Sequence, residues 1–156
     1  MKTVMTLCFI QKGQNVLLGM KKRGFGKGKW NGFGGKVKEN ESIEDAALRE
    51  LKEEVDISVK EMTKQGILEF EFNENPGNIF EVHIFKTEEF EGVPKESEEM
   101  RPQWFSVNNL PLKEMWLDDK YWFPLFFNEK KFLGNFLFEG DDNIIKYTLN
   151  EVEEII

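Results

Sequence analysis

Apolar and polar residues alternate through several short segments of the first half of the chain, which predicts β-strands. Residues 3–10 and 15–20 are apolar segments separated by a polar, glycine-containing turn, a pattern typical of a strand hairpin. Residues 67–72 alternate between apolar and acidic side chains, and residues 79–85 resume the apolar pattern after a Pro-Gly turn at 73–78. These patterns favour strands with one buried face.

The second half of the chain contains three further strand candidates. Residues 100–107 predict a strand, and Pro102 inside it favours an irregular strand or one near a sheet edge. Residues 132–139 and 144–149 predict a closing strand pair joined by a tight turn. We expect an amphipathic tail at 151–156.

Residues 43–55 carry the period of an amphipathic helix. The Ser42 hydroxyl can cap its first turn, and Asp45 stands three residues later in capping-box position. At about 100° per residue, one stripe of this helix must meet a core. That stripe consists of Ile43, Ala47, Leu51 and Val55.

Three glutamates crowd one border of this apolar stripe. Glu54 falls within the stripe, Glu50 lies one turn earlier at its edge, and Glu53 lies just beyond Glu50. Like charges at this spacing repel by about 0.2–0.5 kcal/mol, and burial adds a desolvation cost. A solvated acidic face explains Glu44 and can also explain Glu53, but it does not explain Glu54 among the apolar residues. Clustered carboxylates without histidine or cysteine are typical of a hard divalent cation such as Mg²⁺, so we expect a metal site.

A glycine-rich loop precedes the helix at residues 24–35, GFGKGKWNGFGG. Its glycines and two lysines let backbone N–H groups approach an anion, and the acidic helix that follows favours a phosphate site over a flexible surface turn. Core packing is the preferred interpretation of Trp30 and Phe33. Asn31 is equally compatible with capping the loop and with contacting a ligand.

Residues 112–127 combine aromatic side chains with two adjacent carboxylates. Asp118 and Asp119 can cap a helix at about 120–128. Alternatively, a flat base can stack on Trp116 while the carboxylates accept hydrogen bonds from purine N–H groups. Two close carboxylates in a partly apolar pocket disfavour double ionisation, so our hypothesis includes one that holds a proton.

The remaining chemistry-bearing residues have simpler interpretations. We expect Cys8 to be a small buried hydrophobe and His83 to have a structural role. The acidic residues 88–99 predict a loop in which Glu98 and Glu99 are solvated. If that loop folds back over the acidic helix, one of these two glutamates can complete the metal site.

Length and charge restrict the class of protein. A chain of 156 residues fits one domain and can bury roughly two-thirds of its unfolded surface. A net charge of −8 argues against a nucleic-acid polymer as partner, because phosphate neutralisation needs a basic surface. The single cysteine and the lack of a long apolar segment predict a reducing compartment and no membrane association, with the cytoplasm as the default.

The acidic helix also lies within a recognisable spacing of residues. This segment contains, at fixed intervals, a glycine, a glutamate, an Arg-Glu pair, an aliphatic residue, a Glu-Glu pair and a second aliphatic residue. These residues are Gly35, Glu41, Arg49, Glu50, Leu51, Glu53, Glu54 and Ile57. This pattern resembles the Nudix box of the Nudix hydrolase family. The box usually has glycine where this chain has Asp56. Aspartate tolerates a left-handed helix end better than most residues, so we expect a local cost of about 1 kcal/mol.

Four longer segments extend the resemblance over nearly the whole chain: GMKKRGFGKGKWNGFGGKV, ESEEMRPQWF, MWLDDKYWFP and FLGNFLFEG. They are similar to the animal-type oxidised-purine nucleoside triphosphatase branch of that family. The resemblance implies an α/β fold, the Nudix α/β/α sandwich, with a mixed central β-sheet between helices and one domain over residues 1–156. It also implies Mg²⁺-dependent hydrolysis, with Mn²⁺ as a second candidate cation, of 8-oxo-dGTP, 2-hydroxy-dATP or O6-methyl-dGTP to the monophosphate and pyrophosphate.

The resemblance assigns roles to individual residues. It implies metal binding by Glu50, Glu53, Glu54, Glu99 and Gly34, with Arg49 orienting a box glutamate. It implies base recognition by Asn31, Trp116, Asp118 and Asp119. It implies a pocket wall of Thr6, Lys21, Phe25, Phe70 and Phe72.

Two alternatives remain open at this point: a Nudix enzyme for another nucleotide, and a catalytically silent nucleotide-binding domain. The intact Arg49-Glu50 and Glu53-Glu54 pairs favour the enzyme, because a silent domain has no reason to keep four charges in an unfavourable cluster. We expect a monomer that acts on a small nucleotide in the cytoplasm, with mitochondrial or nuclear pools as further candidates.

Overall fold

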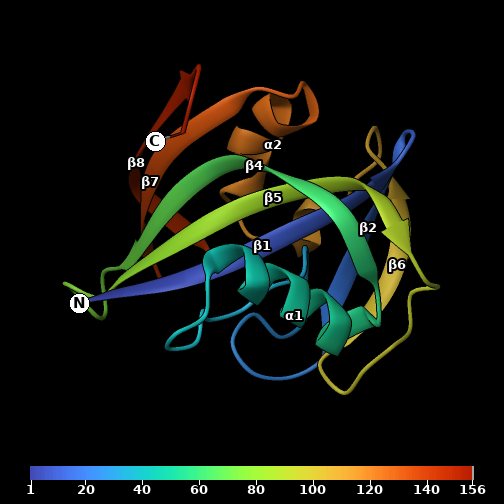
Figure 1. The fold of residues 1–156 in the computed structure, drawn as a ribbon. Coiled ribbons are helices and arrows are strands. Elements are labelled where there is room, and N and C mark those ends of the chain that lie inside the picture. The colour runs from blue at the N-terminus through green and yellow to red at the C-terminus, as the bar shows by residue number, and fades with distance from the viewer. Residues whose placement is uncertain (156) are drawn as a thin grey trace.

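A mixed β-sheet organises the molecule, which a computed structural model describes over residues 1–155 (Figure 1). The strands run in the order β3-β2-β1-β5-β4-β7-β8, and β6 pairs with β2 beside this path. The pairs β1–β5 and β4–β7 are parallel, and the other pairs are antiparallel. Their bounds are β1 (Lys2–Lys12), β2 (Asn15–Lys21), β3 (Trp30–Asn31), β4 (Ser58–Phe72), β5 (Ile79–Glu91), β6 (Met100–Ser106), β7 (Lys131–Glu139) and β8 (Asn143–Val152).

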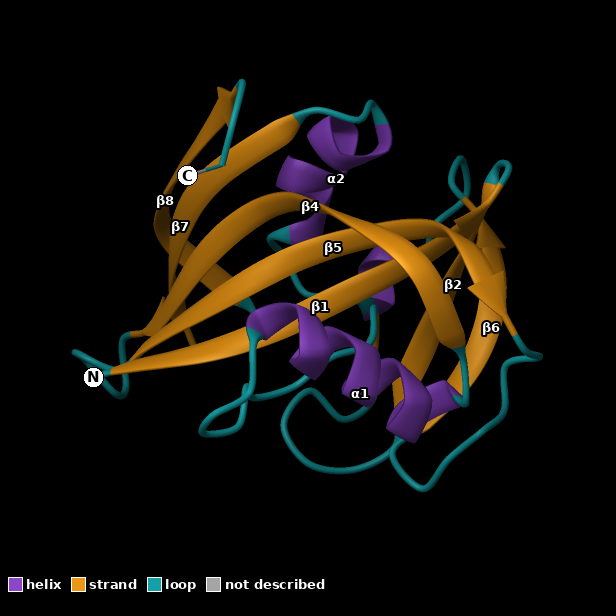
Figure 2. Ribbon diagram, viewed as in Figure 1, coloured by secondary structure: helices purple, strands orange, loops and turns teal. Residues whose placement is uncertain are grey.

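Two helices cover opposite faces of this sheet. In Figure 1, α1 (Ile43–Val55) lies across the front of the strands and α2 (Asp119–Phe127) lies behind them. Figure 2 shows the same arrangement, with the helices in purple and the long loops in teal. A short 3-10 helix, η1 (Leu112–Glu114), precedes α2. The predicted sandwich with a mixed central sheet is therefore confirmed.

Strand alternation explains why the sheet has a core on each face. In β1, Cys8 and Ile10 pack in the cluster that contains the α1 residues, whereas Phe9 packs with the aromatic residues of α2. All three side chains are fully buried. Burial raises the pKa of the Cys8 thiol to about 12, in agreement with its predicted role as a buried hydrophobe.

The ends of α1 follow the local signals in the sequence. The Ser42 hydroxyl accepts a hydrogen bond of 3.1 Å from the backbone N–H of Asp45. At the other end, Asp56 adopts the left-handed conformation with φ 59°, and its carboxylate pairs with Lys52 and Lys95. The predicted helix bounds of 43–55 are confirmed, and Asp56 closes the helix as expected.

The strand predictions located every main segment but placed several ends wrongly. Strand β5 continues to Glu91, so residues 88–91 are not part of a loop, because they pair with the first residues of β4. Strand β8 continues to Val152, which removes two residues from the predicted tail, and Ile156 lies outside the described residues. Helix α2 begins at Asp119 and ends at Phe127, one residue before each predicted end.

The positions of four other residues agree with the sequence predictions. Trp30 and Phe33 are buried, and Pro102 lies in β6, off the main path of the sheet. His83 is buried, and its Nε2 lies 2.8 Å from a carboxylate oxygen of Glu81. No helix within residues 1–155 has both the length and the apolar character needed to cross a bilayer.

Candidate active site

Glu54 is a buried carboxylate on the face of α1 that meets the sheet. Its side chain is 3% exposed, and Oε1 accepts a hydrogen bond of 2.8 Å from the backbone N–H of Gly34. Burial and, as a second cause, the negative charge of Glu50 raise the pKa of Glu54 to about 8. The helix pattern placed Glu54 in the apolar stripe, and the structure confirms this position.

Arg49 links the glutamates around this carboxylate. Its guanidinium donates hydrogen bonds of 2.7 and 3.0 Å to Glu41, 2.9 Å to Glu50 and 3.3 Å to Glu53. It also donates to the backbone carbonyl of Lys36 at 3.1 Å. The pKa of Glu41 falls to about 2 because of Arg49, whereas burial raises the pKa of Glu50 despite the same guanidinium. Arg49 therefore donates hydrogen bonds to three glutamates of the box, and its role in orienting a box glutamate stays a prediction.

A pocket of about 780 Å³ extends from Glu54 to the start of α2. It joins residues that the sequence singled out in several different strands, helices and loops. These residues are Thr6, Lys21, Phe25, Asn31, Gly34, Glu54, Phe70, Phe72, Trp116, Asp118 and Asp119. Among the described residues 1–155, the pocket lining does not include Arg49, Glu50, Glu53 or Glu99. One end of the pocket is thus acidic and close to the glycine-rich loop, and the other end is acidic and aromatic.

The second acidic end consists of two adjacent carboxylates. Asp118 and Asp119 are 4% and 2% exposed, and Asp118 accepts a hydrogen bond of 2.8 Å from Nε1 of Trp122. Oδ2 of Asp119 has no hydrogen-bond partner within the described chain. Burial raises the pKa of both carboxyl groups, and the charge of Asp118 raises the pKa of Asp119 further. The pair is therefore suited to share one proton.

Helix capping does not account for this pair. Asp118 occupies the N-cap position of α2, but its side chain makes no capping hydrogen bond, because Trp122 binds its carboxylate instead. The structure thereby rejects the capping interpretation for Asp118. Both carboxylates line the pocket.

Aromatic rings form the walls between the two ends. The ring centroids of Phe72 and Trp116 lie 6.1 Å apart, and Phe25 contacts both at 5.6 and 5.2 Å. Phe25 is 72% exposed and stands in the loop between β2 and β3. A planar ring can pack against such side chains, since offset and edge contacts are favourable for aromatic groups.

Asn31 and Thr6 line the pocket between these walls and Glu54. The Asn31 side-chain carbonyl accepts a hydrogen bond of 2.8 Å from the N–H of Gly32, which leaves its amide N–H₂ available to a ligand. Asn31 therefore stabilises the loop and still lines the pocket. The Thr6 hydroxyl is buried and has no partner in the described residues.

Comparison with known proteins agrees with this geometry. Residues 1–126 match the NUDIX domain family. The chain belongs to the Nudix family. It is 53% identical to the oxidized purine nucleoside triphosphate hydrolase of Mus musculus over 95% of this chain and 94% of that protein. It is 51% identical to the protein of the same name from Danio rerio, over 97% of each chain.

The fold of this Nudix hydrolase is also similar to solved structures. A crystal structure of the MutT protein from Bacillus halodurans superposes with a TM-score of 0.83 at 29% identity. The superposition covers 95% of this chain and 97% of that chain. Family membership, together with relatives that are named as triphosphate hydrolases, makes the chain a hydrolase.

The carboxylates of the Nudix helix fit a divalent metal ion, which this family generally uses. Burial raises the pKa of both Glu50 and Glu54, and the charge of Glu50 raises that of Glu54 further, so a cation beside them relieves both desolvation and repulsion. Oxygen ligands without histidine or cysteine suit a hard cation. Within residues 1–155, however, no three potential ligands converge as a preformed cage. Arg49 and the Gly34 N–H each bind only one oxygen of these carboxylates, so the second oxygen of each carboxylate can still bind a cation.

Glu99 lies at the mouth of the site but pairs with lysine and arginine. Its carboxylate is 3.5 Å from Nζ of Lys21 and 3.9 Å from Arg23, and its backbone carbonyl accepts from the N–H of Lys22 at 2.8 Å. The backbone N–H of Lys95 in the same loop donates to the carbonyl of Val55 at the end of α1 at 2.9 Å, so the loop folds back toward the Nudix helix, as one sequence hypothesis required. Glu98 pairs with Arg23 at 3.3 Å and is 85% exposed.

Several residues of the pocket were not predicted from the sequence. Lys29, Lys36, Phe80, Phe138 and Asp141 all line it. Phe138 lies in the predicted strand 132–139. The alternation of side chains along that strand could have indicated that Phe138 points toward the core. Trp122 was detectable as well, since it lies four residues after Asp118 on the same helix face. Asp141 carried no such signal, because its position depends on how the β7–β8 turn folds over the pocket.

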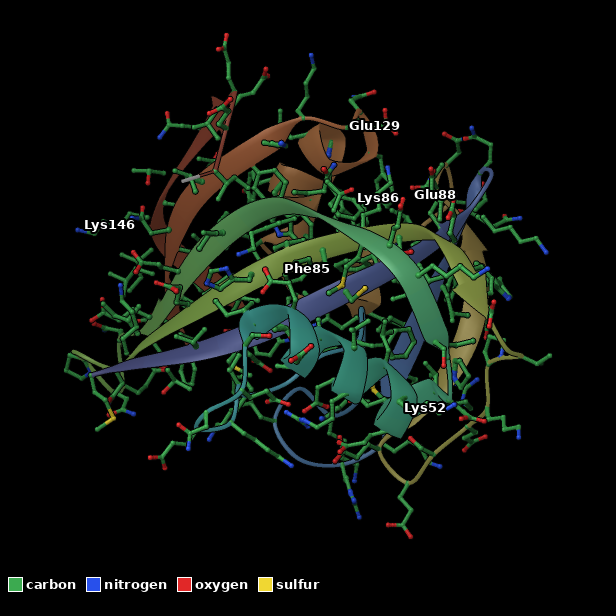
Figure 3. All side chains as sticks on the ribbon, viewed as in Figure 1. Lys52, Phe85, Lys86, Glu88, Glu129 and Lys146 are labelled. Atoms are coloured by element: carbon green, nitrogen blue, oxygen red, sulfur yellow. The ribbon has the colours of Figure 1, made fainter. Side chains whose placement is uncertain are left out.

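A second hollow of about 420 Å³ lies away from this site. Its lining is polar and includes Lys86, Glu88 and Glu129, which Figure 3 labels near the far end of β5 and the end of α2. Nζ of Lys86 is 3.8 Å from the Glu129 carboxylate. This hollow contains none of the predicted site residues.

Proposed function

We propose that this Nudix hydrolase cleaves oxidised or otherwise modified purine nucleoside triphosphates to the monophosphate and pyrophosphate, and so removes them from the nucleotide pool. The observation that carries the proposal is a single pocket with a buried Nudix glutamate at one end and a buried carboxyl pair between aromatic walls at the other. The names of the mouse and zebrafish relatives support the same class of substrate.

The phosphate end provides the groups that hydrolysis of a phosphoanhydride needs. Such a reaction requires charge neutralisation, an oriented water and a stabilised leaving group. We propose that Glu50, Glu53, Glu54 and Glu99, with Gly34, hold Mg²⁺ or Mn²⁺, which supplies electrostatic stabilisation when bound. Lys21 lines the same end and adds a positive charge that can contact a phosphate oxygen. Arg49 keeps Glu50 and Glu53 directed toward this end.

The base end provides the groups that recognise a purine. The aromatic walls can stack on the base, which is worth about 1–3 kcal/mol per base in related contacts. Asp118 and Asp119 share one proton in our proposal, so the pair can donate as well as accept. Oxidation at C8 turns N7 of a purine from acceptor into donor, and an added acceptor in the pocket can then select the damaged base.

The remaining expectations stay part of the proposal. The net charge of −8 favours a small nucleotide over a nucleic-acid polymer. We propose that the residues act as one domain in a cytoplasmic monomer, with mitochondrial or nuclear pools as further sites of action.

The test is a comparison of pyrophosphate release in the presence of Mg²⁺. The substrates are 8-oxo-dGTP, 2-hydroxy-dATP, O6-methyl-dGTP, dGTP and ADP-ribose, and Glu54→Gln is the control variant. We expect the modified purines to be hydrolysed faster than dGTP and ADP-ribose. Equal rates for dGTP and the modified purines contradict the proposed role. Unchanged activity of Glu54→Gln contradicts the metal assignment.

A further inference from the structure

The base end of the pocket is assembled from two segments that lie far apart in the chain. Asn31 belongs to β3, and Trp116 follows the short helix η1. Both side chains line the pocket. The width of the base site therefore depends on how β3 and the residues after η1 are held relative to each other.

The backbone fixes only the first of these segments to the sheet. β3 pairs with β2, and Phe33 exchanges two backbone hydrogen bonds with Cys8 of β1. In contrast, the backbone hydrogen bonds that residues 109–117 make within the described chain all stay between residues 106 and 119. Side-chain contacts must therefore set the position of Trp116 relative to Asn31.

One side-chain hydrogen bond connects the two segments. Nε1 of Trp30 donates to a carboxylate oxygen of Glu114 at 3.3 Å. Trp30 directly precedes Asn31, and Glu114 lies two residues before Trp116. Adjacent side chains of a strand point to opposite faces, so Trp30 points away from the pocket that Asn31 lines. The bond thus joins the two sides of the base site from outside the pocket.

The Trp30 ring is a fixed anchor for this bond. It is 5% exposed, and the guanidinium carbon of Arg101 lies 5.1 Å from its ring centroid. The ring of Phe105 meets it edge-on, with the centroids 4.8 Å apart. Arg101 and Phe105 both belong to β6, which pairs with β2. Because the sheet holds the indole, the hydrogen bond fixes Glu114 and, with it, the segment that carries Trp116.

We propose that Glu114 is a positioning residue for base binding, which holds Trp116 at the correct distance from Asn31 through its hydrogen bond with Trp30. The inference rests on the proposed function, because it assumes that the base enters between Asn31 and Trp116. Among residues 1–155, Glu114 is not part of the pocket lining, so it acts through Trp30 and Trp116. Loss of the bond should therefore weaken binding of the base and leave the chemistry at the phosphate end unchanged.

The experiment measures kcat and KM for pyrophosphate release from the modified purine triphosphate that the unmodified chain hydrolyses fastest, together with thermal unfolding. Glu114→Ala removes the acceptor, Glu114→Gln retains an uncharged acceptor, and Trp30→Phe removes the donor. The double variant combines Glu114→Ala with Trp30→Phe. Glu88→Ala is the matched control, because Glu88 is also an exposed glutamate and is not among the described residues that line the pocket.

We expect Glu114→Ala to raise KM by about threefold to tenfold and to leave kcat within about twofold, as loss of one hydrogen bond that contributes only to binding does. Glu114→Gln should keep KM within about twofold of the unmodified chain, since its amide oxygen still accepts. The double variant should have the KM of Trp30→Phe, because without the donor the carboxylate has no partner to hold.

A KM of Glu114→Ala equal to that of Glu88→Ala overturns the inference, even if the protein is less stable, because the bond then has a structural role only. Equal increases in KM for Glu114→Ala and Glu114→Gln also overturn it, as do effects of Glu114→Ala and Trp30→Phe that multiply in the double variant. The two variants of the exposed Glu114 decide the question even if Trp30→Phe does not fold. All these outcomes leave the proposed function intact, whereas failure of the unmodified chain to hydrolyse any modified purine triphosphate contradicts that function and the inference with it.

Discussion

The backbone N–H of Gly34 donates a hydrogen bond of 2.8 Å to Oε1 of Glu54, and this contact ties the glycine-rich loop to the Nudix helix. The bond only partly offsets the burial of the carboxylate, since the pKa of Glu54 still rises to about 8. The site therefore keeps a group whose charged form is unfavourable until a cation is present. Such a cost at a functional carboxylate is common in active sites.

Glu54→Gln should make the metal-free protein more stable at alkaline pH. Unfolded, Glu54 ionises near 4.5, whereas folded it keeps its proton up to about pH 8. Unfolding in this window releases a proton, so Glu54 reduces the free energy of unfolding progressively as pH rises from 4.5 to 8. Glutamine retains an acceptor for Gly34 and carries no charge. We expect a gain of about 1–3 kcal/mol at about pH 8, and none below about pH 4.5.

Urea denaturation at about pH 5, 7 and 8.5 measures this difference, with chelator present. Glu53→Gln is the matched control on the same helix, because the Glu53 side chain is 55% exposed. A Glu54→Gln protein that is less stable than the unmodified chain at the highest of these pH values contradicts the assigned burial cost.

Arg49→Lys should weaken the Nudix helix site although it keeps the charge. The guanidinium donates to Glu41, Glu50 and Glu53 and to a backbone carbonyl, and a lysine ammonium cannot span these acceptors in one plane. We expect a loss of about 1–2 kcal/mol in the free energy of unfolding, and roughly tenfold or more slower pyrophosphate release. Rates at saturating substrate and chemical denaturation check the two parts.

The control for Arg49→Lys is Lys52→Gln on the same helix. Lys52, labelled in Figure 3, pairs with Asp56 at 2.9 Å and is 61% exposed. Exposed pairs of this kind contribute about 0–1 kcal/mol, so the variant should retain activity. Equal losses in the two variants argue against a special role for Arg49.

The sequence predicted those features that local signals determine. The ends of α1 were correct because Ser42 and Asp56 act within one turn of the helix. The buried position of Glu54 followed from helix geometry alone. In contrast, residues 88–91 were assigned to a loop because their acidic composition hides the pairing with the start of β4, a partner distant in the chain.

At the base end of the pocket, contacts between single side chains also could not be predicted from the sequence. The proximity of Asp118 and Asp119 to Trp116 was evident from the sequence, but the rejection of helix capping by Asp118 depended on its hydrogen bond with Trp122. Lys29 and Asp141 lie far apart in the chain and meet only because the β7–β8 turn folds over the pocket, so no local pattern could indicate their contact.

Gly34→Ala should disrupt the site for a purely steric reason. A Cβ atom at Gly34 would lie 1.8 Å from the backbone carbonyl oxygen of Thr6 and 2.9 Å from Cα of Leu7, and backbone atoms cannot move aside as a flexible side chain can. The loop must therefore shift, which breaks the hydrogen bond to Glu54 and the 2.9 Å bond from Thr6 N–H to the Gly35 carbonyl. We expect a loss of about 3 kcal/mol in the free energy of unfolding and little remaining hydrolysis.

Gly13→Ala separates this steric effect from the conformational preference of glycine. Gly13 has φ 58°, and a Cβ atom added there would meet no atom within 4 Å, so alanine meets only the cost of a left-handed backbone, about 1 kcal/mol. Thermal unfolding of both variants gives the comparison, and pyrophosphate release should be normal in Gly13→Ala. If Gly34→Ala is as stable and active as Gly13→Ala, then the loop is not held against β1 as tightly as the contact with Thr6 requires.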